Sequence, residues 1–362
     1  MKKKILTLIC FTAILFYGCK KENQTAVTEN SATQDNAVTS GCIKTVVIIN
    51  SAIAVNTTWD SCHYYYVQTN LGITAKLTIE PGTVIKFNKT GAIQLNGGGS
   101  IKANGTSSHP IIFTSDKDDS YGNDITGDGN TTPQPGDWDL INLNGESNSS
   151  FKYCILRYGG HLGAGGVLLV SANAQNTIIN HCRFQYILSN LDFNNTRAAL
   201  DARGGGIGTV ITNNSFKQNT LPLGVSTAFN LDNSNSFTQN HFQCIKVSNS
   251  FAPQQDISWA ATAQPFAIEG SLSFVGETLT LSPGVVLKFA GPTFGLTFKD
   301  ATHCINHNAQ GVRFTSTKDD YNSFDSNGDG SATSPQAGDW LGVFWNDENK
   351  YFKWSNVKYS KH

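Results

Sequence analysis

The sequence predicts an all-β chain that folds as a parallel β-solenoid, and three observations support this. Short stretches alternate apolar and polar residues and are separated by Gly, Pro and Asn, as strands joined by turns require. No window keeps a helical period over three turns. Similar segments also recur within the chain, which is typical of repeat architectures.

The internal repeat is the strongest of these signals. Ala75–Phe87 (AKLTIEPGTVIKF) matches Glu277–Phe289 (ETLTLSPGVVLKF), and Pro110–Asp119 (PIIFTSDKDD) matches Gly311–Asp320 (GVRFTSTKDD). The offset between the copies is 201 or 202 residues throughout. Each copy alternates apolar and polar residues on both sides of a Pro-Gly turn, which predicts strand, turn and strand. The matches define two similar blocks, about residues 59–161 and 256–362.

The segment between the blocks contains a weaker repeat. TIINHCRFQYI (Thr177–Ile187), TVITNNSFKQN (Thr209–Asn219) and SFTQNHFQCI (Ser236–Ile245) each combine Asn with a Phe-bearing strand. Steps of roughly 25–30 residues suit one coil of a solenoid. We therefore expect one row of side chains to point inward in every coil, with Asn amides forming a ladder along the axis and aliphatic and Phe residues filling the core.

These motifs resemble bacterial right-handed parallel β-helix proteins of the pectin-lyase-like superfamily, including surface lipoproteins of Bacteroidetes-type bacteria. The resemblance covers nearly all of residues 50–362 and implies the fold. It implies no single activity, because that superfamily contains lyases, hydrolases and adhesins. An array of β-sandwiches is the alternative fold, and the lack of obvious two-residue hairpin turns disfavours it.

The N-terminus predicts export and a lipid anchor. Three lysines precede an apolar run of 13 residues, which is long enough for a signal peptide and too short to span a membrane. Gly18 and Cys19 then resemble a lipobox, although an ordinary secretory signal cut elsewhere is the alternative. The expected organisation is a signal peptide (1–18), a disordered tether (19–41) that begins at lipidated Cys19, and one β-helix domain (42–362). The expected location is the bacterial outer membrane, at the cell surface or on the periplasmic face, with the lipid as the only membrane contact.

Charge and cysteine content limit the partners. Removing residues 1–18 takes away three lysines and moves the formal charge from −1 to −4. A mildly acidic chain without a basic block excludes nucleic acid as a partner. Six cysteines remain after Cys19, and Cys42 with Cys62 is the expected disulfide, because it would join the start of the domain to its first block. No Cys or His spacing indicates zinc.

Two acidic loops predict calcium. The segments DSNGDG (325–330) and DITGDG (124–129) place oxygen-bearing side chains at alternate positions around a glycine turn, as a calcium loop does. Neither is an EF-hand, because the twelfth position holds Gln336 or Pro135 rather than Glu. A solvated turn is the alternative, but so many carboxylates repel one another without a cation. The expected ligands are Asp119, Asp124, Thr126, Asp128 and Asp137 in the first block and Asp320, Asp325, Asn327, Asp329 and Asp339 in the second, with Asp118 and Asp319 as further candidates.

No residue is assigned a catalytic role. The best candidates are Asp192, Arg197, Asp201 and Arg203 in LDFNNTRAALDARGGG, where solvated turn residues are the alternative interpretation. The expected function is a calcium-stabilised β-helix that binds a glycan or a surface protein without catalysis. The alternative is a polysaccharide lyase that acts on acidic glycans through Arg197 or Arg203.

Two features concern packing. Trp138 and Trp340 follow Gly-Asp at the same place in both blocks, which favours core positions where the chain rejoins the coil. The second block stops at His362, so its last coil needs cover from Trp345–Tyr359 or from a partner.

Overall fold

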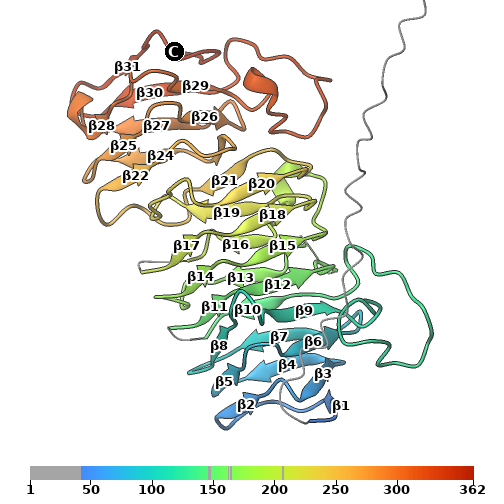
Figure 1. Cartoon of the computed structure of the whole chain (residues 1–362). Helices are drawn as coiled ribbons and strands as arrows, with labels where there is room; N and C mark the ends of the chain where they lie inside the picture. Colours follow the sequence, from blue (N-terminus) through green and yellow to red (C-terminus); the bar gives the residue numbers. More distant parts are fainter. Residues whose placement is uncertain (1–41, 146–147, 162, 164, 206–207) are drawn as a thin grey trace, which may run out of the picture. The chain divides into compact units, whose positions relative to one another are not determined.

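The chain winds into successive coils of short strands. The computed structural model describes residues 42–145, 148–161, 163, 165–205 and 208–362, and Cys42–His362 forms one compact unit. Within it each strand pairs in parallel with the strand above or below, apart from one hairpin near the C-terminus (Figure 1). The predicted all-β parallel β-helix is confirmed, and a β-sandwich array is excluded. The predicted signal peptide, the tether and Cys19 lie outside the described residues.

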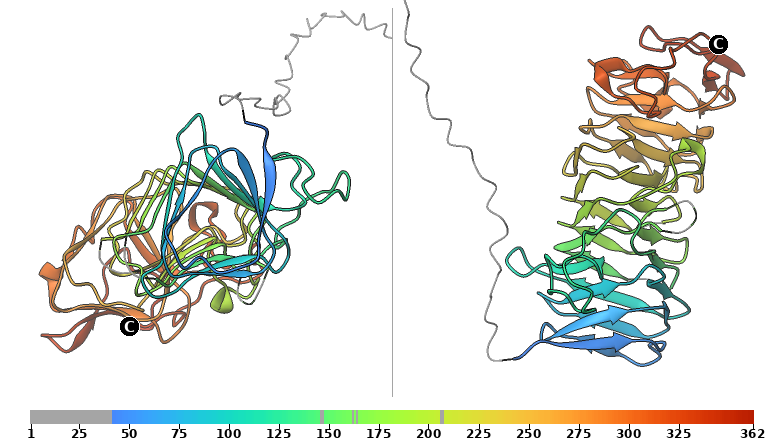
Figure 2. Two further views of the ribbon diagram at one scale, coloured as in Figure 1. Left: turned by 90° about the horizontal axis from the view of Figure 1, so that it is seen from below. Right: turned by 90° about the vertical axis from the view of Figure 1, so that its right-hand side faces the viewer.

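The described strands form five sheets along the faces of the coils (Figure 2). An eight-stranded sheet contains β1 (Thr45–Ile49), β3 (His63–Val67), β6 (Val84–Phe87), β9 (Ile111–Ser115), β12 (Cys154–Arg157), β15 (Arg183–Gln185), β18 (Ser215–Lys217) and β20 (Ser236–Thr238). A ten-stranded sheet contains β4 (Asn70–Ile73), β7 (Ala92–Leu95), β10 (Ile141–Leu143), β13 (Leu168–Val170), β16 (Leu200–Ala202), β19 (Leu223–Ser226), β21 (Ile245–Ser248), β23 (Phe266–Glu269), β26 (Val286–Phe289) and β29 (Arg313–Ser316).

The remaining described elements complete the coils. A six-stranded sheet contains β2 (Thr57–Trp59), β5 (Lys76–Ile79), β8 (Ser100–Asn104), β11 (Ser150–Lys152), β14 (Ile178–Asn180) and β17 (Val210–Thr212). The two small sheets are β22 (Ile257–Trp259), β25 (Leu279–Leu281) and β28 (Cys304–Ile305), and β24 (Leu272–Phe274), β27 (Gly295–Phe298), β30 (Gly342–Trp345) and β31 (Lys350–Phe352). Three short 3₁₀ turns are η1 (Phe193–Asn195), η2 (Ala301–His303) and η3 (Tyr321–Ser323). No helix of the described residues is long and apolar enough to cross a membrane.

The period-2 pattern of the sequence decides which side chains enter the core. In β5, Leu77 and Ile79 are buried whereas Lys76 and Thr78 are not, because successive side chains of a strand point to opposite faces. Parallel pairing places Leu77 directly below Ile101 and Ile79 below Ala103. Every inward residue therefore stacks on the inward residue of the neighbouring coil.

The middle segment shows this stacking most clearly. Phe184, Phe216 and Phe237 form a column with ring centroids 4.9 and 5.2 Å apart. On either side of it, Asn214 donates to Asn235 Oδ1 and Asn219 donates to Asn240 Oδ1, both at 3.1 Å. These side chains are buried and also bond main-chain groups of the next coil. The predicted Asn ladder is confirmed.

The coils vary in length more than the sequence pattern predicts. Tyr64 pairs with Val84, a step of 20 residues, whereas Arg183 pairs with Ser215, a step of 32. Strand pairing fixes only the straight faces, so the corners take up the difference.

The second block is not stacked in the same orientation as the first. Val84–Phe87 lies in the eight-stranded sheet, but its repeat copy Val286–Phe289 continues the ten-stranded sheet. The second block is therefore rotated about the axis of the β-helix relative to the first, so that equivalent strands lie on different faces. The turn follows from the end of the eight-stranded sheet at β20, after which β21 pairs with β23.

At the C-terminal end the chain folds back over part of the last coil. β30 and β31 form the antiparallel hairpin, Trp345 stacks on Phe352, and Trp354 stacks on His307 with ring centroids 4.0 Å apart. The sequence left open whether this end covers itself or meets a partner. In the described residues Val357 pairs with Phe314, so the C-terminal segment covers β29, whereas β28 and β31 are end strands of their sheets.

Cysteines occupy two kinds of position. Cys42 and Cys62 form a disulfide that ties the start of the unit to the turn before β3. The other four cysteines of the described residues, Cys154, Cys182, Cys244 and Cys304, are free and buried.

The Asn ladder generates a stability prediction. Replacing Asn219 with Ala leaves the buried backbone N–H of Ile187 without its acceptor, and it removes the amide donor to the carbonyl of Phe184 and to Asn240 Oδ1. Each buried orphan costs about 1–3 kcal/mol, so the free energy of unfolding should fall by about 3 kcal/mol in urea titrations. Exposed Asn249→Ala is the matched control and should change it by no more than about 0.5 kcal/mol. Equal effects of the two variants would contradict a structural role for the ladder.

Candidate functional site

The two acidic loops belong to long excursions that leave the coils at equivalent points. The first excursion (116–137) lies between β9 and β10, and the second (317–339) lies between β29 and β30. Both project from the stack of coils, the first in teal and the second in orange-red in Figure 1. Their bases are built from the same contacts in both copies.

A buried tryptophan closes each excursion where it rejoins the coil. Trp138 and Trp340 are fully buried, and each indole Nε1–H donates to a backbone carbonyl at 2.7 Å, that of Arg157 or Lys358. Each ring also stacks on a core Phe of the preceding coil, at 4.2 and 4.0 Å between centroids. The expectation that both tryptophans are core residues is confirmed.

An aspartate before each tryptophan holds the base together. Asp137 accepts hydrogen bonds from Lys117 Nζ at 2.9 Å and from the backbone N–H of Gln134 at 2.7 Å. Asp339 repeats both contacts with Lys318 and Gln336, at 2.8 and 2.9 Å. Asp137 and Asp339, two of the expected calcium ligands, are thus engaged with lysine and main chain.

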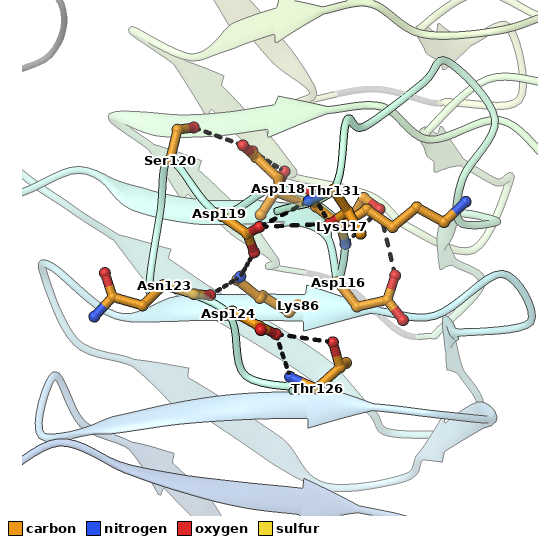
Figure 3. Close-up of polar contacts among 12 residues, drawn as sticks. Lys86, Asp116, Lys117, Asp118, Asp119, Ser120, Asn123, Asp124, Thr126 and Thr131 are labelled. Carbon is orange, nitrogen blue, oxygen red and sulfur yellow. Dashed lines mark hydrogen bonds and ion pairs between the residues drawn. The ribbon is translucent and has the colours of Figure 1, made fainter. Parts of the chain in front are cut away.

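A lysine from the sheet lies beneath each acidic loop. Lys86 and Lys288 have no solvent exposure, and each Nζ donates to a backbone carbonyl of the excursion, that of Asn123 or Phe324. Figure 3 shows Lys86 Nζ directed toward Asn123 and Asp119, whose Oδ1 lies 3.8 Å away. Burial lowers the pKa of both lysines, and it lowers that of Lys288 to about 8 even though nearby aspartates oppose the shift.

A second buried carboxylate links each excursion to the sheet. Asp118 accepts a hydrogen bond from Thr114 and lies 3.4 Å from Arg157 Nε. The copy, Asp319, accepts one from Thr315 and one from Arg313 Nη2 at 2.9 Å.

The first acidic loop is exposed and bonds mainly to itself. Asp124 accepts hydrogen bonds from the backbone N–H groups of Thr126, Gly127 and Gly129 at 3.1, 2.7 and 2.9 Å. These bonds, that of Gly129 foremost, lower the pKa of Asp124 to about 2. Gly127 and Gly129 adopt positive φ angles of 76° and 82°, which glycine tolerates at no steric cost. Asp128 accepts from Thr126 Oγ1 at 2.6 Å.

The second acidic loop packs against the coils. Asp325 accepts from the N–H groups of Asp329 and Gly330 at 3.1 and 2.9 Å, and its own carbonyl accepts from the backbone N–H of Gln243 at 3.0 Å. A Cβ on Gly328 would lie 2.7 Å from the ring of Phe242, so only glycine fits this contact. Asp329 accepts from Asn327 Nδ2 at 2.9 Å and from Thr333, whose hydroxyl is the main cause of its lowered pKa.

Three oxygens of the expected ligand set lack hydrogen bonds. Asp119 Oδ1, Asp320 Oδ1 and Asn327 Oδ1 are buried atoms without a hydrogen-bond partner in the described part of the chain. Burial and the neighbouring carboxylates, that of Asp325 foremost, raise the pKa of Asp320. No three Asp, Glu, His or Cys side chains of the described residues converge as a group that could hold a metal ion. Each excursion therefore holds at least one buried oxygen without a hydrogen bond near further carboxylates, and the described residues form no closed coordination shell around it.

The four catalytic candidates of the middle segment do not come together in one site. Asp192 caps η1, and no ion pair among the described residues links it to Arg197. Arg203 does lie in a cluster, with Asp201 at 2.7 Å and Glu269 at 2.9 Å. Buried Lys246 completes the cluster, with its Nζ 3.0 Å from Glu269.

The charges of this cluster set the protonation state of Arg203. Burial alone would lower the pKa of Arg203, but the ion pairs with Asp201 and Glu269 outweigh that effect and raise it. An arginine held in this way keeps its proton, whereas a general base must be able to lose one.

The sequence did not lead us to the buried lysines beneath the acidic loops and in the Arg203 cluster. Lys86, Lys288 and Lys246 were not singled out, and neither was Glu269. A signal was present for the first two, because GTVIKF and GVVLKF place a lysine in an otherwise apolar strand of each copy. Such a lysine needs a partner on the outer face of the sheet, and each acidic excursion provides one.

The depressed pKa of Lys288 predicts a pH dependence of stability. The folded state binds fewer protons than the unfolded chain between the folded pKa of about 8 and the ordinary value of 10.5, so stability due to this group rises with pH across that range. The free energy of unfolding of the wild type should therefore rise between pH 8 and pH 10.5 relative to Lys288→Met in urea titrations. Exposed Lys299→Met is the control and should run parallel to the wild type. A constant difference between wild type and Lys288→Met would contradict the buried charge.

Comparison with known proteins agrees with this architecture. Residues 51–218 match a family model described as a pectate-lyase-like beta helix domain. No curated protein and no solved structure matches the chain. The matched region covers the coils from the first block to β18, and the same parallel stacking continues beyond it to β29. The match over residues 51–218 and the parallel sheets together support a right-handed parallel β-helix of the pectin-lyase-like superfamily.

Proposed function

We propose that this protein is an extracytoplasmic, lipid-anchored binding module whose β-helix is stabilised by calcium at its two acidic excursions. It binds a glycan or a surface protein and does not catalyse a reaction on it. The observation that carries the calcium part is a buried carboxylate oxygen without a hydrogen bond at the same place in both excursions, Asp119 Oδ1 and Asp320 Oδ1, with Asn327 Oδ1 as a third such atom in the second excursion.

The chemistry of these atoms favours a hard cation. Calcium takes several oxygen ligands from carboxylates, amides and main chain, and all the candidate donors here are of that kind. A buried carboxylate oxygen without a donor is costly, and a cation would remove that cost. Asp119, Asp124 and Asp128 would serve the first excursion, whereas Asp320, Asp325, Asn327 and Asp329 would serve the second. Asp137 and Asp339 are ion-paired with lysines. They would therefore stabilise the base of each excursion through those contacts.

The buried lysines reduce the repulsion between carboxylates that calcium would have to relieve. Lys86 and Lys288 already place a positive charge beneath each loop, so the carboxylates are partly neutralised without metal. The excursions are also held by the tryptophans and by Asp137 and Asp339. Calcium is therefore expected to stabilise a protein that folds without it, with the weak affinity of extracellular sites.

The proposed location follows from the sequence and from the disulfide. A signal peptide followed by Cys19 provides a route for export and acylation. Disulfides persist in oxidising compartments, and Cys42–Cys62 is consistent with such an environment.

Polysaccharide lyase activity is the second candidate. The observation that favours it is the cluster of Asp201, Arg203, Lys246 and Glu269 on the outer side of the ten-stranded sheet, where cations and carboxylates lie together. The raised pKa of Arg203 argues against this residue as the base, so binding without catalysis is preferred.

Calcium should raise the melting temperature of the full chain. At a calcium concentration of about ten times the dissociation constant, binding to the folded state adds about 1.4 kcal/mol per site. Differential scanning fluorimetry in about 10 mM calcium, compared with chelator and with magnesium, measures the shift. Asp329→Asn should lose part of the shift, because it weakens the second excursion only. Exposed Asp347→Asn should retain the full shift, and equal melting temperatures in calcium and chelator would refute the metal.

A combined glycan array and uronate panel separates the two candidate functions. The full chain should bind a glycan or capture a surface protein and release no unsaturated product from any acidic glycan. Product that disappears in both Arg203→Ala and Arg203→Lys would instead establish the lyase. Arg197→Ala is the control, because Arg197 lies outside the charged cluster.

A further inference from the structure

The first coil exposes apolar side chains to an unusual degree. Ile43, Val46, Ile48 and Val55 are 91, 42, 54 and 73% exposed, and they lie within 13 residues of one another. β1 alternates strictly, so Val47 and Ile49 pack against the core while Val46 and Ile48 face outward. Large apolar side chains gathered at one end of a molecule are typical of an interface.

The outer edge of β1 is also free of strand partners in the described part of the chain. β1 is the end strand of the eight-stranded sheet, and β3 is its one strand partner among residues 42–145, 148–161, 163, 165–205 and 208–362. Its other edge presents backbone N–H and C=O groups that can pair with another strand. At the opposite end part of the last coil is covered, because Val357 pairs with Phe314 of β29 and β31 folds back on β30.

This edge lacks the usual protection against association. Natural edge strands carry charges or proline that block pairing. From Cys42 to Trp59 there is no proline, and Lys44 is the only charged residue. Its Nζ lies over the ring of Tyr64 at 5.1 Å, away from the strand edge. The sequence of β1, TVVII, is instead rich in residues that favour strands.

We propose that the β1 edge is a dimer interface occupied by a second copy of this chain. The two β1 strands pair antiparallel about a twofold axis at Val47, so that Val46 of each copy opposes Ile48 of the other. Lys44 then opposes uncharged Asn50, and no like charges meet along the strands. The two eight-stranded sheets become one continuous sheet across the axis.

Symmetry and hydrogen bonding favour this occupant. A twofold axis closes the assembly, whereas parallel pairing of identical edges would not close. A lipid surface would cover Val46 and Ile48 but would leave the N–H and C=O groups of the edge without partners. The arrangement depends on neither calcium nor the lipid anchor, so it stands or falls separately from the proposed function.

The oligomeric state of the full chain tests the interface. We use the Cys19→Ser chain, which carries no acyl group, and measure its mass by light scattering across a concentration series. A dimer is expected, and Val46→Lys with Ile48→Lys should raise its dissociation constant at least about tenfold, because the introduced ammonium groups of the two copies would oppose one another across the strand pair and repel. The control pair Val275→Lys and Ile305→Lys replaces exposed apolar residues elsewhere and should leave the dimer intact.

Disulfide cross-linking tests the register independently of stability. Val47 lies on the twofold axis, so Val47→Cys should give a covalent dimer under mild oxidation, because opposed residues of an antiparallel pair are within reach of a disulfide. Ile49→Cys is the matched control, since it opposes Thr45 of the other copy and should cross-link far less.

Three results would overturn the proposal. The first is a monomer at every concentration, including one that binds lipid vesicles through this end. The second is a mass that grows beyond the dimer. The third is a dimer that survives the paired lysine substitutions and cross-links equally through positions 47 and 49.

Discussion

Parallel pairing between successive coils is the interaction on which the rest of this structure depends. Each strand gives its backbone hydrogen bonds to the coils above and below, so equivalent residues lie over one another in columns. A column is stable when its members suit one another, as in the stacked Phe184, Phe216 and Phe237 and the paired amides of Asn214 and Asn235. The same rule leaves strand edges at the ends of the stack. Among the described residues, the C-terminal segment pairs with β29 through Val357, whereas the outer edge of β1 has no strand partner.

Column stacking also explains how the excursions are held. Each leaves the coil after an outer-face threonine, Thr114 or Thr315, which lies beside Lys86 or Lys288 of the preceding coil. Both lysines are sealed from solvent by the acidic loop above them. Lysine and loop are therefore one unit, in which a buried cation and a set of carboxylates lower each other's energetic cost. The proposed metal ion would add to this arrangement rather than create it.

The duplicated excursions and the charged cluster of the middle segment have different implications for function. A feature built twice with the same contacts points to a duty within each block, because an active site is needed only once. The cluster around Arg203 occurs once, yet its ion pairs hold the arginine protonated. Both observations favour a scaffold that presents surfaces over one that performs proton transfer.

The sequence by itself determined the all-β class, the two blocks, the inward columns and the acidic loops, because strand alternation and internal repetition are local patterns. It could not determine that Val286–Phe289 lies on a different face from Val84–Phe87, since corner lengths and pairing choices decide the face. Nor could it show that Asp137 contacts Lys117 or that Lys246 meets Glu269. Those contacts join residues from separate turns of the chain, and only the stacking of coils brings them within hydrogen-bonding distance.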